Sequence, residues 1–368
     1  MSVSEAEREL LRDTVGQLLA EHCTPERVAA ATVSGAGWDA VTWRALQETG
    51  LTLVGSPEEH GGSGADLSEA ADIAVAAGVA AAPVPLAETL VAGMVLARAG
   101  LDIPDGPLTL AVAGPGGGPA GSGVIRLRRV PYGRIATTVA VGAGAGGDWL
   151  CVVPAPEQVA VAGSNLAGEP RDDIELGSDA PVREVAAGLA DHARRLRQLF
   201  RSLLIAGVAQ RALELTITYV TEREQFGRPL GKMPVVQSEL ARMAGEVALI
   251  SAATQAAVAA TGVGPDAAPG TDEPGRGGTG LATGSISAVL AAKAQASVGA
   301  GVIAAIAHQL HGAIGTTQEH RLRLTTTRLW AWRDEDGPAA ECLAALGRAA
   351  AAASAPGSGG LWPWLSGT

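Results

Sequence analysis

Residues 223–243 read Arg-Glu-Gln-Phe-Gly-Arg-Pro-Leu-Gly-Lys-Met-Pro-Val-Val-Gln-Ser-Glu-Leu-Ala-Arg-Met, and this stretch decides the fold. On both sides of it, apolar residues recur at helical spacing, which predicts one long helix over about 182–222 and another from Pro234. Gly227 can adopt the left-handed conformation that ends a helix, and Pro229 cannot continue one. The sequence therefore predicts a sharp turn between two long helices.

Two arginines of this turn, Arg223 and Arg228, suggest a binding function. They come shortly before the expected helix N-terminus, where free N–H groups and the helix dipole already favour an anion such as phosphate. The alternative interpretation is that both guanidinium groups are solvated or ion-paired at the surface.

Composition limits the class of protein. With 368 residues, 47% of them hydrophobic, the chain is expected to form more than one domain. No apolar run looks long enough to span a bilayer and the N-terminus is acidic, so we expect a cytoplasmic protein without a membrane partner. A net charge of −11 argues against nucleic acid, although local arginines can still hold a nucleotide cofactor. The three distant cysteines indicate a reducing compartment and a packing role.

The expected fold class is mostly α with a small central β domain. Residues 1–103 are predicted to form a helical domain, with helices over 4–22, 38–49, 67–82 and 86–99. Residues 104–178 contain short Val, Leu and Ile runs separated by Gly, Pro and Asp, which predict a reduced antiparallel β domain. Residues 179–368 are predicted to form a helical bundle, interrupted by a flexible loop over 261–284.

A spacing of Gly-x-Gly-x-x-Gly at Gly142, Gly144 and Gly147 resembles a dinucleotide fingerprint. We reject that interpretation because a strand is predicted over 149–153, where the fingerprint requires a helix.

A second motif occupies residues 309–320, Gln-Leu-His-Gly-Ala-Ile-Gly-Thr-Thr-Gln-Glu-His. Gly312 and Gly315 permit a tight turn and a close approach of the backbone to a ligand, and a helix is expected to start at Thr316 or Thr317. The histidines of this region lack the Cys or carboxylate partners of a metal site, so no metal is predicted.

Both motifs resemble those of acyl-CoA dehydrogenases, and the order of the N-terminal helices and of the segment 50–64 is similar as well. The resemblance implies that fold, FAD as cofactor, an acyl-CoA substrate and an acceptor like electron-transfer flavoprotein. It also implies contacts to the ADP half of a flavin that a neighbouring subunit holds. The residues that it assigns to those contacts are Arg223, Gln225, Phe226, Gln309, Gly312 and Gly315.

The β domain departs from this family. Nothing in it matches the Thr-Glu-Pro-x-x-Gly-Ser-Asp-like segment that holds the flavin ring in the family, and residues 114–118 are only Gly and Pro. The resemblance therefore implies a hetero-oligomer in which a homologous subunit supplies the ring pocket, although assembly with itself stays open. Shortened, paired members of the family suggest sterol-like or other bulky acyl groups by analogy.

The family places its catalytic acid at one of two positions. Ungapped counting puts Arg197 at the first, and Asp336 at the second, with Glu335 beside it. Asp336 or Glu335 is therefore the candidate base for α,β-dehydrogenation of an acyl-CoA. The alternative is that residues 334–336 form only a solvated loop and helix cap, which makes this chain a catalytically silent subunit that completes the FAD site of its partner. Another flavoenzyme on the same fold, such as an oxidase, is a third possibility.

Overall fold

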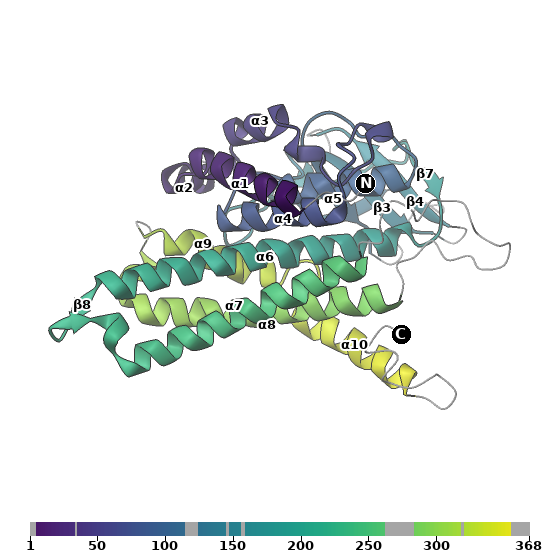
Figure 1. Ribbon diagram of the computed structural model, residues 1–368. Coiled ribbons are helices and arrows are strands. Elements are labelled where there is room, and N and C mark those ends of the chain that lie inside the picture. Colours follow the sequence, from purple (N-terminus) through teal and green to yellow (C-terminus); the bar gives the residue numbers. More distant parts are fainter. Residues whose placement is uncertain are drawn as a thin grey trace.

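The computed structural model describes residues 5–33, 35–114, 124–144, 147–155, 159–261, 283–317 and 320–354. The N-terminal helices pack on one side of three long helices, and the strands lie beside the N-terminal helices at one end of the molecule (Figure 1). This is the expected arrangement of a helical domain, a small β domain and a helical bundle.

Five helices form the N-terminal domain: α1 (Glu5–His22), α2 (Pro25–Val33), α3 (Ala40–Glu48), α4 (Leu67–Val79) and α5 (Leu86–Arg98). Helix α2 was not anticipated from the sequence. Asp66 begins α4 with a capping box, because its side chain accepts from the N–H groups of Ser68 and Glu69 while the Glu69 carboxylate accepts from the N–H of Asp66.

The β domain has two sheets. Its strands are β1 (Leu108–Val112), β2 (Ile125–Pro131), β3 (Thr137–Ala143), β4 (Asp148–Val153), β5 (Val159–Val161), β6 (Arg171–Leu176) and β7 (Arg183–Val185). One sheet has the order β1-β3-β4-β7 and the other β2-β6-β5. Strands β1 and β3 are parallel, so the expectation of a purely antiparallel domain is wrong at this pair. Strand β7 also lies beyond the boundary expected at residue 178.

Gly142 lies within strand β3 and does not open a nucleotide-binding turn. Strands β3 and β4 pair in antiparallel register with Gly142 opposite Trp149, and a Cβ at Gly142 would lie 2.6 Å from the Trp149 ring. The glycine is therefore needed for packing, and a strand follows it as expected.

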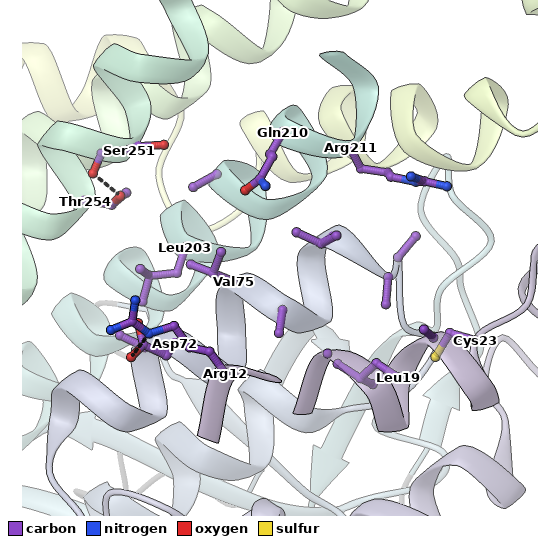
Figure 2. Close-up of a pocket in the computed structure, with 18 of the residues that line it drawn as sticks. Arg12, Leu19, Cys23, Asp72, Val75, Leu203, Gln210, Arg211, Ser251 and Thr254 are labelled. Carbon is purple, nitrogen blue, oxygen red and sulfur yellow. Dashed lines mark hydrogen bonds and ion pairs between the residues drawn. The ribbon is translucent and has the colours of Figure 1, made fainter. Parts of the chain in front are cut away.

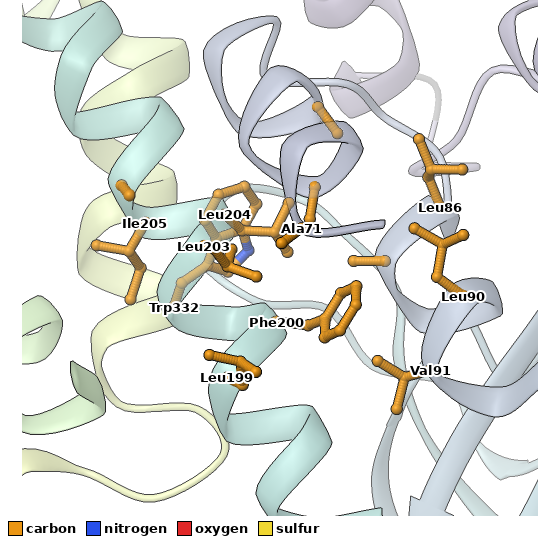
Figure 3. Close-up of a cluster of buried hydrophobic side chains, with 14 of the residues drawn as sticks. Ala71, Leu86, Leu90, Val91, Leu199, Phe200, Leu203, Leu204, Ile205 and Trp332 are labelled. Atoms are coloured by element: carbon orange, nitrogen blue, oxygen red, sulfur yellow. The ribbon is translucent and has the colours of Figure 1, made fainter. Parts of the chain in front are cut away.

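The C-terminal domain is a bundle of long helices. They are α6 (Leu189–Glu222), α7 (Pro234–Thr261), α8 (Thr283–His311), α9 (Leu322–Arg333) and α10 (Ala339–Ala353), with the 3-10 turns η3 (Leu230–Lys232) and η4 (Gly312–Thr316). Helix α6 is the centre of the molecule. Its buried side chain Phe200 points toward Leu90 and Val91 of α5, and all three belong to one core that joins the two helical domains (Figure 3).

The turn between α6 and α7 is a β-hairpin. Strands β8 (Glu224–Gln225) and β9 (Arg228–Pro229) pair, and the two loop residues Phe226 and Gly227 have φ of +53° and +76°. Two positive φ angles in a two-residue loop are the signature of a type I′ turn. Gly227 has the expected left-handed conformation, but the strand pairing was not predicted.

Within the part of the chain that the structure describes, three segments are long and apolar enough to cross a membrane by length and composition: α6, α7 and Ser285–Thr316. Hydropathy therefore does not exclude a span, contrary to the sequence expectation. In α6 and in Ser285–Thr316, 56% and 67% of the apolar window is buried within the protein itself, whereas the fraction in α7 is 28%. The absence of a membrane partner stays a prediction.

Several sequence expectations fall outside the described residues. These are the flexible loop, of which 262–282 is not described, most of the loop 114–118, and Glu319 of the second motif.

Candidate functional site

The hairpin between α6 and α7 projects into solvent at the end of the long helices that lies away from the β domain (Figure 1). Arg223 and Gln225 are exposed, and the Phe226 side chain at its tip is 90% exposed. Within the described residues, neither Arg223 nor Gln225 makes a side-chain hydrogen bond or ion pair. The hairpin therefore leaves an aromatic ring and a guanidinium group accessible to another molecule.

The glycine motif lies at the same end of α6. The Tyr219 hydroxyl donates to the backbone oxygen of His311 at 3.3 Å, and the two rings stack with centroids 4.4 Å apart. Tyr219 also accepts the N–H of Arg223 through its backbone oxygen at 2.8 Å. The structure thus brings the two sequence motifs together, about 85 residues apart in the chain, although no hydrogen bond among the described residues joins Arg223 directly to Gly312.

The details of the glycine motif differ from the expectation. Residues Gly312–Thr316 form the 3-10 turn η4, and the next α-helix begins at Leu322 rather than at Thr316 or Thr317. Gly312 has φ of +63° and is exposed, as is Gln309. Gly315 is buried, and a Cβ there would lie 2.7 Å from the His311 Cβ. Gly315 therefore allows helix packing and presents no free surface to a ligand.

The histidines near this turn pack against aromatic rings. His308 stacks on Trp330 with centroids 5.0 Å apart and meets the Thr326 hydroxyl at 2.9 Å, while His311 lies edge-on to His320. Burial lowers the pKa of all three imidazoles, so they are neutral near pH 7. Among the residues that the structure describes, no group of three or more His, Cys, Asp or Glu side chains is placed to hold a metal.

Asp336, the first candidate base, lies in a buried ion-pair network. Its carboxylate is 2.5 Å from the Arg197 guanidinium group and 2.9 Å from the Nε of Arg201, and its side chain is 4% exposed. Burial alone would raise the pKa of this carboxyl, but Arg197 and Arg201 outweigh burial and hold the pKa well below its usual range. A carboxylate that is this hard to protonate is a weak proton acceptor.

Glu335, the second candidate, is held in the same network. Arg171 donates to both of its carboxylate oxygens, at 2.9 and 2.8 Å, and Asn165 donates to it at 3.0 Å. Arg201 lies 3.4 Å from it. The carboxylate of Glu335 is therefore already hydrogen-bonded or ion-paired with Arg171, Asn165 and Arg201.

Glu169 completes the network between the β domain and α9. It accepts from Arg171 at 3.0 Å and from the Trp332 indole at 2.8 Å, and Arg328 lies 3.1 Å away. Burial would raise its pKa, but Arg328 and Arg171 reverse the effect and lower it to about 2. Paired charges of this kind are strongly destabilised when one partner is removed.

Very little space is left beside these charges. One void next to Arg197, Arg201 and Asp336 has a volume of 20 Å³, and another between Glu88 and Trp332 has a volume of 10 Å³. Pockets for small molecules have volumes of about 300–1,000 Å³. Among the described residues, the two voids beside this network are too small for an acyl thioester.

The hairpin and the ion-pair network are far apart in one chain. Arg197 and Arg223 lie 26 residues apart on and directly after the single helix α6. At a rise of 1.5 Å per residue this separation is about 39 Å. The hairpin therefore cannot serve chemistry at Asp336 of its own chain.

Comparisons with known proteins agree with this architecture. The model of the acyl-CoA dehydrogenase N-terminal domain matches residues 5–102, and that of the C-terminal domain matches residues 197–338. The chain is 30% identical over 347 residues to acyl-CoA dehydrogenase IpdE2 of Mycolicibacterium smegmatis, which covers 92% of this chain and 97% of that protein. The chain belongs to the acyl-CoA dehydrogenase family.

Solved structures of this family have the same fold. A variant of the Tcur3481-Tcur3483 steroid ACAD superposes with a TM-score of 0.79 at 26% identity, over 93% of this chain and 97% of that one. The ChsE4-ChsE5 complex from Mycobacterium tuberculosis also gives a TM-score of 0.79, at 24% identity, over 95% and 98% of the two chains.

Seen within the acyl-CoA dehydrogenase family, the contact between Arg197 and Asp336 has a clear meaning. These are the two positions at which the resemblance places the family's catalytic acid, one in α6 and one after α9. The structure brings them into contact, as expected if either can serve one active site. In this chain, however, the first position holds Arg197, and its guanidinium group neutralises the carboxylate of Asp336 at the second position.

The residues present fit the ADP half of FAD better than its ring. Arg223 and Gln225 offer donors on an exposed hairpin, and Gly312 leaves an open backbone beside it. Around Asp336, where substrate and flavin ring would have to meet, the described side chains fill the space with ion pairs.

Sequence reasoning missed the arginines that neutralise the candidate acids. Arg201 follows Leu199 and Phe200 on the buried face of α6, and Arg171 is buried in β6. A charged residue among core positions of a helix signals a buried partner, because an unpaired buried charge is too costly. That signal was available in the sequence, but it does not identify the partner.

Proposed function

We propose that this chain is one subunit of a heteromeric, FAD-dependent acyl-CoA dehydrogenase, and that it is the subunit without a working catalytic base. It acts by completing the flavin site of a homologous partner through the hairpin after α6. A bulky, steroid-like acyl group is the proposed substrate class of the complex, by analogy with the steroid ACAD of similar structure. A cytoplasmic location and an acceptor like electron-transfer flavoprotein are part of the same proposal.

The contact between Arg197 and Asp336 is the observation that supports the silent role. A base for this reaction has to accept the α proton of the thioester, which requires a carboxylate with a normal or raised pKa and space for the substrate beside it. Asp336 has a lowered pKa and two guanidinium partners. The voids of 20 and 10 Å³ that the described residues leave around the network are too small for the thioester.

The position of the hairpin supports a contribution to a second subunit. When bound, FAD supplies hydride acceptance from the β carbon of the acyl group. The role of this chain is to place the guanidinium group of Arg223 and the ring of Phe226 against the distal part of that cofactor. A charge-assisted hydrogen bond from arginine suits a pyrophosphate, and the type I′ turn fixes the direction from which it is offered.

The test is to purify the chain alone and together with the homologous subunit and to count FAD per chain in each sample. The expected result is less than stoichiometric FAD on the isolated, folded chain and one FAD per pair of subunits in the complex. One FAD per subunit on the isolated chain, with turnover of an acyl-CoA, would show that the proposal is wrong.

The catalytic alternative has one argument in its favour, because the resemblance places one of the family's two positions for the catalytic acid at Asp336. Activity of the reconstituted complex after changing Asp336, compared with changing the partner's acid, separates the two roles.

A further inference from the structure

A cavity of 1040 Å³ lies between the N-terminal helices and the long bundle, on the side of α6 formed by residues 203–215. Helices α1 and α4 form one wall, α6 and α7 form the other, and α9 closes one end (Figure 2). The ion-pair network faces α5 and the β domain instead, and among the cavity-lining residues none belongs to that network. The cavity is therefore separate from the place where the family's chemistry would occur.

The floor of the cavity is apolar and made of small or branched side chains. Leu19 of α1, Val75 of α4 and Leu203 of α6 face it, and alanines at positions such as Ala76 and Ala206 leave space between the helices (Figure 2). A volume of 1040 Å³ is at the upper end of the range for small-molecule pockets. A floor of this kind suits a bulky apolar body better than a thin chain.

The two ends of the cavity differ in charge. At one end, Arg8 and Arg12 are neutralised by Asp72, at 2.8 and 3.3 Å, and Arg12 also pairs with Glu5 at 2.8 Å. This end has no net charge to offer a ligand.

At the opposite end lies Arg211, beyond Gln210 (Figure 2), and Arg321 of the segment before α9 lines the cavity as well. Arg211 pairs with Glu214, at 3.1 Å, and both side chains are at least a third exposed, so this pair is weak and replaceable. The lining contains four arginines against Glu5 and Asp72 in a chain with a net charge of −11. Arg211 and Arg321 are therefore the charged lining groups at this end, and the acids near them, Glu214 and Glu26, lie outside the lining.

From this arrangement we infer a second binding site, for an amphipathic organic anion with a bulky apolar body and one acidic group. The apolar body lies on the floor between Val75 and Leu203, and the acidic group meets Arg211 and Arg321. This inference does not depend on the proposed function, because it concerns a cavity within one chain that neither the hairpin nor Asp336 reaches.

The probes are 1-anilinonaphthalene-8-sulfonate and N-phenyl-1-naphthylamine, which have the same rings with and without the sulfonate. Both are titrated by fluorescence into the full-length chain, alone and with its partner subunit. The expected result is saturable binding of the sulfonate at one site per chain, about tenfold tighter than binding of the neutral compound, the effect of one charge-assisted hydrogen bond.

Two variants test the two halves of the site. Ala76→Trp places an indole ring on the floor of the cavity and is expected to remove the saturable binding of both probes, whereas Ala344→Trp, on the exposed face of α10, is expected to leave it unchanged. The double variant Arg211→Gln/Arg321→Gln is expected to weaken the sulfonate about tenfold without weakening the neutral probe.

The matched control for charge is Arg242→Gln, an exposed arginine of α7 outside the cavity. Equal affinities of the two probes for the wild type, or an unchanged sulfonate affinity in the Arg211→Gln/Arg321→Gln protein, would overturn the inference. If saturable binding persists in a folded Ala76→Trp protein, the probe binds elsewhere and the inference is also overturned. The arginine variant leaves the apolar floor intact, so the test does not depend on whether Ala76→Trp folds.

Discussion

Replacing Asp336 by Asn is expected to lower the stability of this chain while leaving the turnover of the reconstituted complex unchanged. Asp336 has φ of +57°, a conformation that Asn tolerates and Ala does not, so Asn removes the charge without adding backbone strain. The variant leaves Arg197 and Arg201 without their shared carboxylate.

The size of the effect follows from the burial of the pair. Removing one partner of a buried ion pair costs about 3–5 kcal/mol, and we expect the lower end because the amide oxygen of Asn can still accept one hydrogen bond. The entropy of unfolding is about 2.1 cal/mol/K per residue, or about 0.8 kcal/mol/K for 368 residues. A loss of about 3 kcal/mol therefore lowers Tm by about 4 °C.

The assay combines calorimetry of the chain with turnover of acyl-CoA substrates by the complex, using an artificial electron acceptor. Asp334→Asn is the matched control, because the Asp334 side chain is 65% exposed and its ion pair with Arg333, at 3.3 Å, lies at the surface, so its Tm should change by less than about 1 °C. A fall in turnover of about 10²–10⁴-fold with an unchanged Tm is the signature of a lost general base and would refute the reasoning. In that case Asp336 is catalytic and the chain is the active subunit.

Three further outcomes are expected. Arg223→Ala should weaken FAD binding by the complex by about 1.5–3 kcal/mol, measured by flavin fluorescence on dilution, and retention equal to that of Arg242→Ala would reduce Arg223 to a surface residue. The pKa of Glu169 is lowered to about 2, so its contribution to stability is complete above its unfolded pKa of about 4.3 and is lost as the pH falls toward 2. Between pH 5 and 2, the free energy of unfolding measured with urea should therefore fall less steeply with pH in Glu169→Gln than in the wild type. Equal pH slopes for the two proteins would contradict this. Gly315→Ala should destabilise the chain by about 1–3 kcal/mol, because the added Cβ would lie 2.7 Å from His311, and an unchanged urea midpoint would contradict this packing.

The sequence was sufficient for the architecture because its strongest signals are local. The apolar period of α6 and α7 and the stop at Gly227 are both decided by residues within a few positions of each other. The strand predicted over 149–153 is found within β4 (Asp148–Val153) for the same reason.

The parts that were not predicted depend on contacts between distant residues. Strand β1 pairs with β3 in parallel, and the apolar pattern of a strand does not indicate which other strand lies next to it. The bidentate contact of Arg171 with Glu335 joins residues 164 positions apart. Neither follows from spacing, because a buried charge reveals that it needs a partner and not which one it finds.

The candidate site shows the same division. The motif around Arg223 was readable because its residues are consecutive and stay in solvent. The state of Asp336 was not readable, since its proton affinity is determined by Arg197 and Arg201 from another helix. Whether the motif residues contact FAD stays a prediction.

Helix α6 also acts as a lever. One end carries Arg197 and Arg201, which clamp it to the loop after α9, and the other end carries the hairpin about 39 Å away. A tilt of about 1° at the clamp moves the tip of such a rod by about 0.7 Å. The ion pairs around Asp336 therefore also hold Arg223 in position, so a substitution that tilts α6, in contrast to the isosteric Asp336→Asn, is expected to weaken flavin binding in another subunit.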